Sequence, residues 1–257
     1  MGAPFPLDLP RRTAKPRAVG ITHVLDKGLP ARELDGLLES SGAYIDVWKF
    51  GWGTAYVDPG VEEKLATLAR HGILGCVGGT LLEVAWSQRR VEEFLNWADA
   101  LGFPCVEVSR GMAPMRPDEK YELIQTAARR FTVLSEVGAK DPGEHMLCPD
   151  WADEVAGDLA AGARWVLCEG RESGTVGIYH PDGKVREDVV TAVLEAGGVD
   201  RVVFEAPRKD QQAWFVHHCG ANANLANIPI AEVLGLETLR LGLRADTMKL
   251  PAPVAHQ

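Results

Sequence analysis

The stretch YIDVWKFGWGT, residues 44–54, places a lysine inside a run of residues that favour a β-strand. Val47, Trp48 and Phe50 suit a pleated, half-buried surface. Lys49 does not, because burying an ammonium group without a partner is unfavourable. We therefore expect an anionic partner for Lys49 where this strand ends, beside glycines that let the backbone approach a ligand closely.

Seven other β-rich runs accompany this one, and amphipathic stretches with helical spacing separate them. Eight such units in 257 residues predict an α/β protein with one (β/α)8 TIM barrel. A doubly wound sheet is the alternative, but the chain lacks its GxGxxG fingerprint. We expect an N-terminal arm at 1–18 and a catalytic barrel domain at 19–250. The predicted strands are 19–26, 44–51, 73–79, 105–111, 131–138, 164–172, 201–207 and 222–228, and the predicted helices are 31–40, 61–71, 91–101, 118–130, 151–161, 187–195, 211–218 and 230–243.

Composition narrows the range of partners. The net charge of -9 argues against nucleic acid and anionic membranes, which both require a positive face. No apolar run reaches the roughly 18 to 20 residues that span a bilayer. The five cysteines form no CxxC pair, which indicates reduced thiols and a cytoplasmic location. The expected partners are therefore small anionic substrates, held by a local cluster of lysine and arginine.

Charged residues recur at the carboxyl ends of the predicted strands. In a (β/α)8 barrel these ends converge on one mouth, where active sites of this fold lie. Four glutamates at matching strand positions are unusual for packing alone, although buried Glu–Lys pairs would be a structural explanation. The segments GWGT (51–54) and GGT (78–80) could turn backbone N–H groups toward an anion. The charged residues are Asp26, Lys27, Lys49, Glu107, Arg110, Glu136, Glu169, Arg171 and Glu205.

A mouth that carries several carboxylates beside cationic groups suits a divalent cation together with an anionic substrate. Mg²⁺ prefers hard oxygen ligands such as carboxylates. The HxH, HExxH and cysteine-rich spacings typical of zinc are missing from the sequence. Isolated histidines such as His23 are interpreted as structural or surface residues. We therefore expect Mg²⁺ as the cofactor.

With these residues identified, the chain resembles the phosphosulfolactate synthase family, whose members add sulfite to phosphoenolpyruvate in coenzyme M biosynthesis. The motifs GITHVLDKGLP, YIDVWKFGWGT, GGTLLEVA, FPCVEVSRG, VLSEVGAK, EGRESG, VVFEAP, NLANI and LETLRLGLRADT carry the resemblance in order from residue 20 to 247. The family implies a (β/α)8 lyase that forms a C–S bond by a Mg²⁺-dependent Michael-type addition through an enolate-like intermediate. A homo-oligomer is also expected.

The resemblance and the charge pattern together suggest catalytic, metal-binding and substrate-binding roles for individual residues. Lys140 matches the second lysine of the family's EVGKK segment and is the expected acid that protonates the intermediate. Lys49 and Asp26 are grouped with it as catalytic, although Asp26 is expected to pair with a lysine. The expected metal ligands are Glu136 and Glu169, with Glu107 and Glu205 as further candidates. The expected substrate-binding residues are Lys27, Gly78, Gly79, Thr80, Arg110, Arg171 and Gln211.

Two departures from the family pattern leave alternatives open. The family usually has SDG after the fourth strand, and this chain has SRG with Arg110; Ala139 replaces the first lysine of EVGKK. A divergent enzyme with another nucleophile or another phosphorylated or enolpyruvyl acid is one alternative. The other is a non-catalytic, stress-related binding protein like the plant heat-stress-associated proteins. The retained lysines and glutamates argue against the latter.

Overall fold

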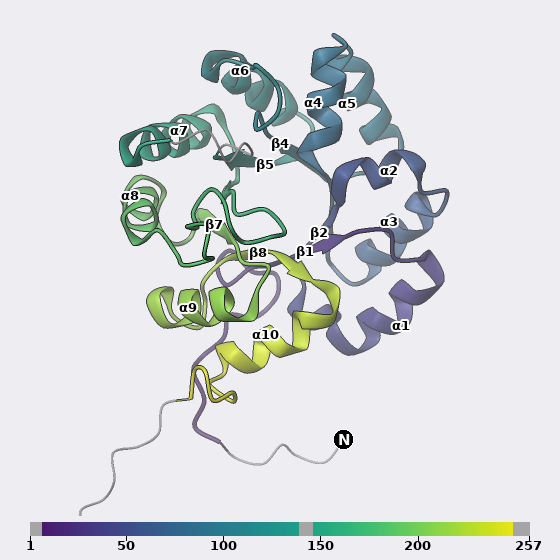
Figure 1. Cartoon of the computed structure of the whole chain (residues 1–257). Helices are drawn as coiled ribbons and strands as arrows, with labels where there is room; N and C mark the ends of the chain where they lie inside the picture. The colour runs from purple at the N-terminus through teal and green to yellow at the C-terminus, as the bar shows by residue number, and fades with distance from the viewer. Residues whose placement is uncertain (1–6, 139–145, 249–257) are drawn as a thin grey trace, which may run out of the picture.

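A computed structural model describes residues 7–138 and 146–248 of the chain. Its eight strands are all parallel and follow one another around a closed barrel in sequence order (Figure 1). The predicted (β/α)8 barrel is therefore confirmed. The strands are β1 Thr22–Asp26, β2 Val47–Phe50, β3 Leu74–Val77, β4 Cys105–Val108, β5 Thr132–Val137, β6 Trp165–Cys168, β7 Val202–Glu205 and β8 Leu225–Pro229.

Helices surround the strands (Figure 1), and each predicted helix is present. Two helices were not predicted: the short α2, and α4, which begins at the glycine pair that the sequence suggested was a loop. The predicted helix at 230–243 is divided into a 3-10 turn, Ile230–Glu232, and α10. The helices are α1 Ala31–Ser41, α2 Thr54–Val57, α3 Val61–Arg70, α4 Gly79–Ser87, α5 Val91–Ala100, α6 Pro117–Ala127, α7 Cys148–Ala161, α8 Glu187–Gly197, α9 Lys209–Cys219 and α10 Val233–Arg240. None of the helices in the described ranges is long and apolar enough to cross a membrane.

Alternation along the strands separates two environments, because successive side chains point to opposite faces of the sheet. On β2, Trp48 and Phe50 pack outward in the layer between sheet and helices, whereas Val47 lies in the barrel interior. The interior is apolar over part of its length and charged at the carboxyl ends of the strands. Its apolar part consists of Ile21, Val47, Cys76, Cys105, Leu134, Trp165, Leu167, Val203 and Ala226.

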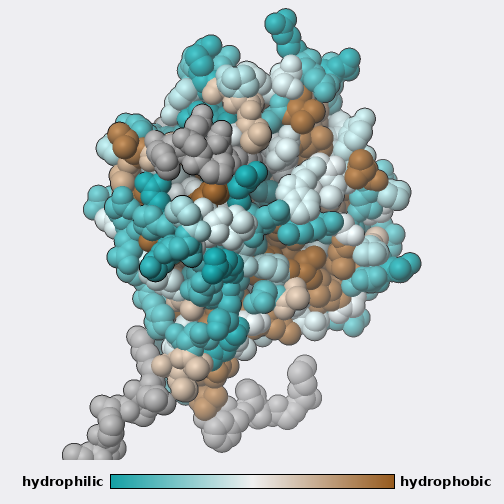
Figure 2. Space-filling model, in the orientation of Figure 1, coloured by the Kyte–Doolittle hydropathy of each residue, from teal (hydrophilic) through white to brown (hydrophobic). Residues whose placement is uncertain are grey.

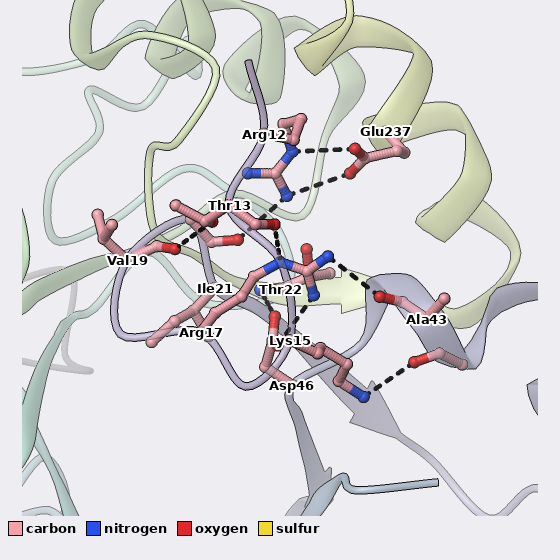
Figure 3. Close-up of polar contacts among 12 residues, drawn as sticks. Arg12, Thr13, Lys15, Arg17, Val19, Ile21, Thr22, Ala43, Asp46 and Glu237 are labelled. Atoms are coloured by element: carbon pink, nitrogen blue, oxygen red, sulfur yellow. Dashed lines mark hydrogen bonds and ion pairs between the residues drawn. The ribbon is translucent and has the colours of Figure 1, made fainter.

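The described part of the N-terminal arm, residues 7–18, contains neither helix nor strand and is bonded to the barrel by several side chains (Figure 3). Arg12 forms a salt bridge of 2.9 Å with Glu237. Lys15 donates to the carbonyl oxygen of Gly42 at 3.0 Å. Arg17 pairs with Asp46 at 3.0 Å. Gly42 and Asp46 precede β2, and Glu237 lies in α10, which runs back from the carboxyl end of β8. The arm therefore lies at the amino-terminal side of the barrel, away from the carboxyl ends of the strands.

Candidate active site

A pocket opens at the carboxyl ends of the strands, and we call it the mouth pocket. It receives side chains from β1, β2, β5, β7 and β8 and from the segments that follow β2, β3, β4 and β6. Figure 2 shows the surface in the orientation of Figure 1, with hydrophilic and hydrophobic residues interspersed. The lining residues are Leu25, Lys49, Gly51, Trp52, Gly78, Thr80, Met112, Glu136, Glu169, Arg171, Glu172, Ser173, Glu205 and Asn227. Seven predicted site residues are therefore gathered in one place: Lys49, Gly78, Thr80, Glu136, Glu169, Arg171 and Glu205.

Lys49 has anionic partners in two glutamates, which form the buried Glu–Lys pairs that the sequence analysis named as a structural explanation. Its ammonium nitrogen lies 2.7 Å from Glu107 Oε2 and 3.6 Å from Glu136 Oε2. All three residues are buried. The alternation of strand residues produces this arrangement, because Lys49, Glu107 and Glu136 each stand an even number of positions from apolar residues of the barrel interior.

Two further glutamates are fixed by the chain that follows β6. Glu169 accepts a hydrogen bond from the backbone N–H of Arg171 at 2.6 Å, and Glu205 accepts one from the N–H of Gly170 at 2.9 Å. Arg171 has a left-handed φ of 54°, which is unusual for a residue with a side chain. These bonds hold the turn after β6 so that both carboxylates and the guanidinium group line one pocket.

Electrostatic coupling inside the pocket changes two pKa values. Burial alone would lower the pKa of Lys49, but Glu107, Glu136 and Glu205 outweigh it and raise this pKa well above its usual value. The lysine is therefore a permanent cation. Burial, reinforced by Glu136, raises the pKa of Glu205 above its usual value.

His23 on β1 is buried and neutral. Burial and then the charge of Lys49 lower its pKa to about 3. The unfolded chain binds a proton at His23 near its ordinary pKa of about 6.5. The unfolded state thus binds more protons between pH 3 and 6.5, and the stability that this group contributes is lost as pH falls through that range.

We expect His23→Asn to lower the slope of unfolding free energy against pH by up to about 1.4 kcal/mol per pH unit between pH 4 and 6. Urea denaturation at several pH values measures this slope. An unchanged slope would show that His23 is protonated in the folded protein.

Three predicted residues lie next to the mouth pocket without lining it. The backbone N–H of Gly79 donates to Glu107 at 2.9 Å, so it does not point at a ligand as we expected. Glu107 contacts Lys49, which lines the pocket, but Glu107 does not line the pocket itself. Lys27 is half exposed and lies 3.4 Å from Glu172 and 5.0 Å from the centre of the Trp52 ring. Because Glu172 and Trp52 both line the pocket, Lys27 stands at its rim.

Asp26 does not reach the mouth pocket, and the expectation that it shares this site was wrong. Its neighbour Leu25 faces the pocket, so Asp26 faces the opposite side of the sheet. There it forms a buried salt bridge with Lys64 at 2.9 Å and accepts hydrogen bonds from Trp48 Nε1 and from the N–H of Gly28. The expected pairing with a lysine is confirmed, and its observed function is to shape the turn before α1.

Arg110 was also expected to bind substrate at the mouth, but it lines a neighbouring pocket with Gly138 and Glu154 and does not line the mouth pocket. Its guanidinium group makes two hydrogen bonds to Glu154 of α7, at 3.0 and 2.7 Å. Glu154 also binds the fully buried Lys120, which contacts Asp158 at 2.6 Å. Two cations thus meet two carboxylates outside the mouth pocket. The arginine is neutralised locally, so it leaves the charge of the pocket unchanged.

Two other residues, Gln211 and Lys140, were expected to act on the substrate. Gln211 was expected to meet an anion, but its amide nitrogen donates to the carbonyl oxygens of Gly174 at 2.8 Å and Gly183 at 3.2 Å. It therefore anchors the segment between β6 and α8. Lys140, the expected acid, lies outside the described residues.

The sequence analysis missed Asn227 of β8, which lines the mouth pocket. Its backbone N–H donates to Nδ1 of His23 at 3.2 Å, and its side-chain amide donates to Glu205. The amide oxygen is buried and has no hydrogen-bond partner. Asn227 lies in the middle of β8, Leu225–Pro229, so no charged strand end marked it in the sequence. His23, which the sequence analysis interpreted as structural, accepts the hydrogen bond from the backbone N–H of Asn227.

The donor atoms of the pocket have the chemistry that Mg²⁺ requires. Glu136, Glu169 and Glu205 supply carboxylate oxygens, and Asn227 supplies the unpartnered amide oxygen. Within the described ranges, no three His, Cys, Asp or Glu residues are already grouped around a single metal position. In the same ranges, four glutamates surround the cations Lys49 and Arg171. A divalent cation would balance this excess of negative charge.

Comparisons with known proteins identify the family. The family model described as (2R)-phospho-3-sulfolactate synthase (ComA) matches residues 10–246. The chain is 41% identical over 249 residues to a phosphosulfolactate synthase of Bacillus subtilis (strain 168), covering 96% of this chain and 99% of that protein. It is 43% identical over 245 residues to one of Methanothermobacter thermautotrophicus, covering 93% and 95%.

Among solved structures, 3-hexulose-6-phosphate synthase has a TM-score of 0.55 and 16% identity, covering 85% of this chain and 98% of that chain. At this identity the likeness concerns the fold alone, and it agrees with the barrel described above. The sequence comparisons extend over nearly the whole chain and include the strand ends that form the mouth pocket. The chain therefore belongs to the (2R)-phospho-3-sulfolactate synthase family.

Proposed function

We propose that this protein is a phosphosulfolactate synthase that adds sulfite to phosphoenolpyruvate at the mouth pocket. The observation that carries this proposal is the near full-length similarity to phosphosulfolactate synthases, at 41% and 43% identity. The geometry agrees with it, because seven of the predicted site residues line one pocket. Two cationic side chains and several oxygen donors there suit a small substrate with both a phosphate and a carboxylate group.

The reaction forms one bond to sulfur and one to hydrogen. The sulfur lone pair of sulfite attacks C3 of phosphoenolpyruvate, and the electron pair of the C2–C3 double bond moves into the carboxylate. A proton from the protein then bonds to C2, which leaves a sulfonated, phosphorylated three-carbon acid. No bond to the phosphate breaks. The enzyme must therefore stabilise the doubly charged carboxylate and deliver one proton.

The residues of the mouth pocket can divide this work between them. Arg171 is the natural phosphate ligand, because a guanidinium group binds phosphate through two parallel hydrogen bonds. Thr80 also lines the pocket and offers a hydroxyl donor, whereas the N–H of Gly78 is bonded to the carbonyl oxygen of Phe50. Lys49 is held by its carboxylate partners as a permanent cation, so it stabilises the negative charge that develops on the substrate carboxylate.

Glu136 and Glu169 would hold a Mg²⁺ ion, with Glu205 as a further ligand. When bound, this ion supplies positive charge that stabilises the developing dianion. The side chains of the mouth pocket orient the substrate between Arg171 and Lys49 and limit the access of water. The half-exposed Lys27 at the rim can attract the incoming anions.

Lys140 remains our proposal for the acid that protonates C2. It follows Glu136 by four residues in the sequence. We expect Lys140→Met to lower kcat by about 10²–10⁴-fold, the usual contribution of a general acid, while phosphoenolpyruvate still binds. Steady-state kinetics together with calorimetric binding measure the two effects. Activity within a few-fold of the wild type would assign the proton to another group.

Two alternatives lose their main support. The idea of a different substrate depended on an additional arginine charge in the mouth, and Arg110 is instead paired with Glu154. The idea of a non-catalytic binding protein is disfavoured by the ordered arrangement of Lys49, Arg171 and the glutamates. Assembly into a homo-oligomer and a cytoplasmic location stay predictions of the sequence analysis.

Consumption of phosphoenolpyruvate tests the proposed function directly. The enolpyruvate absorbance should fall only when the protein, sulfite and Mg²⁺ are all present, and chelation of the metal should stop the reaction. Loss of absorbance without sulfite, or no loss across a range of pH and metal concentrations, would contradict the assignment. Arg110→Met serves as a control that changes charge outside the mouth pocket.

A further inference from the structure

Strand β8 contains an irregularity at the level of the active site. Thr22 of β1 pairs with Leu225, and Val24 pairs with Ile228, so one residue of β1 stands opposite two residues of β8. The single residue is His23, and the two are Ala226 and Asn227. This is a β-bulge, a device that bends a strand and changes the direction of a side chain, often beside active sites.

The bulge allows consecutive residues to face the barrel interior. Ala226 packs in the apolar interior, and Asn227 lines the mouth pocket. Regular alternation would have turned one of them outward. Asn227 accommodates the bulge with a left-handed φ of 53°, a conformation that asparagine tolerates better than most residues.

Two hydrogen bonds fix the direction of the Asn227 side chain. The backbone N–H donates to Nδ1 of His23, and the amide nitrogen donates to the carboxylate of Glu205. A carboxylate accepts hydrogen bonds, so it must face the NH₂ group and not the oxygen of the amide. The amide oxygen is thereby directed away from Glu205, and it is buried without a partner in a residue that is 7% exposed.

A buried carbonyl oxygen without a partner is unfavourable. Fully deprotonated phosphoenolpyruvate and sulfite offer it no hydrogen-bond donor, because in that form both anions only accept hydrogen bonds. A hard cation or a water molecule bound to one can satisfy it, since both interact with amide oxygens. The donor chemistry therefore matches the metal ion and not the substrate.

We propose that Asn227 supplies a neutral oxygen to the divalent cation of the mouth pocket, which Glu205 and Glu136 also line. This inference rests on the proposed function for the identity of the cation. The bulge at β8, the hydrogen bond to His23 and the contact with Glu205 exist to place this oxygen. His23 acts as a positioning residue behind it.

Binding of Mn²⁺ without any substrate tests the proposal, measured by electron paramagnetic resonance titration. Asn227→Gly removes the amide and suits the left-handed φ, so the fold should survive, which circular dichroism and thermal unfolding will check. Asn227→Asp keeps an oxygen in place and loses the NH₂ donor. We expect the glycine variant to bind Mn²⁺ about 10–100-fold more weakly and the aspartate variant to stay within about threefold of the wild type or bind more tightly.

Three results would overturn the inference. Equal weakening in both variants would show that Asn227 matters only as a donor to Glu205. Unchanged affinity in the glycine variant would exclude the oxygen as a ligand, and so would a wild-type protein that does not bind Mn²⁺. The proposed function is judged separately by the sulfite-dependent loss of phosphoenolpyruvate, so a failure of one is not a failure of the other.

Discussion

Lys49→Met will abolish most of the activity and destabilise the protein at the same time. The substitution removes a permanent cation that contacts Glu107 at 2.7 Å and Glu136 at 3.6 Å, so it leaves buried carboxylates without their counter-charge. Breaking a buried ion pair in this way is destabilising by about 3–5 kcal/mol. Losing a fixed charge beside the reacting carboxylate lowers kcat by about 10²–10³-fold. Urea denaturation and steady-state kinetics measure the two effects.

A double variant separates these two roles of Lys49. Lys49→Met combined with Glu107→Gln removes both members of the shorter ion pair, so stability should recover in part while activity stays low. The coupling free energy from the double-mutant cycle then measures the pair itself. A fully active single variant would show that Lys49 only balances buried charge, and this result would contradict its proposed role in catalysis.

Lys120→Met will have the largest effect on stability outside the pocket. Lys120 of α6 is completely buried, binds Glu154 at 2.8 Å and Asp158 at 2.6 Å, and donates to the carbonyl oxygen of Glu136 at 2.8 Å. Its loss leaves the buried Asp158 without this cation, while Glu154 keeps its pair with Arg110. We expect the free energy of unfolding to fall by about 3–5 kcal/mol, measured by chemical denaturation.

The position of Lys120 behind β5 also connects it to the active site. Its bond to the backbone of Glu136 fixes the strand position from which that glutamate enters the mouth pocket. We therefore expect weaker metal binding in Lys120→Met even at temperatures where the variant is folded. Arg116→Met on the exposed surface before α6 is the matched control and should change neither quantity. Wild-type stability in Lys120→Met would refute the account of this cluster.

Much of this molecule could be predicted from the strand pattern. Each strand repeats a short apolar run that ends in charged residues, and only a barrel brings all of these ends to one mouth. Helix α4 was missed because Gly78 and Gly79 suggested a loop, yet Gly79 is required for another reason. A Cβ atom there would lie 2.4 Å from the hydroxyl of Ser109. Close packing, not a turn, explains this glycine.

The errors at Asp26 and Arg110 have a common cause. Proximity to a strand end places a residue near the mouth, but the face of the sheet decides whether it enters the pocket. Leu25 faces inward, so the next residue, Asp26, had to face the helices, and the sequence contained this information. Arg110 lies beyond the last residue of β4, where alternation no longer applies. Its pairing with Glu154 depends on where α7 packs.

Asn227 could not have been assigned to the pocket from alternation alone. Ala226 occupies the inward position, so regular spacing would turn Asn227 toward the helices. Only the pairing register between β1 and β8 shows the extra residue that reverses this direction. Features of this kind depend on contacts between segments about 200 residues apart, and they become visible only in the folded structure.

The most direct test of the account is the fate of C3 of phosphoenolpyruvate. With substrate labelled by carbon-13 at C3, and with sulfite and Mg²⁺ present, nuclear magnetic resonance should show the vinyl carbon becoming a methylene carbon bonded to sulfur, while phosphorus stays esterified. The Lys49→Met and Lys140→Met variants should leave the vinyl signal nearly unchanged. A methyl signal of pyruvate with free phosphate, or no change with the wild-type protein, would contradict the assignment of the mouth pocket.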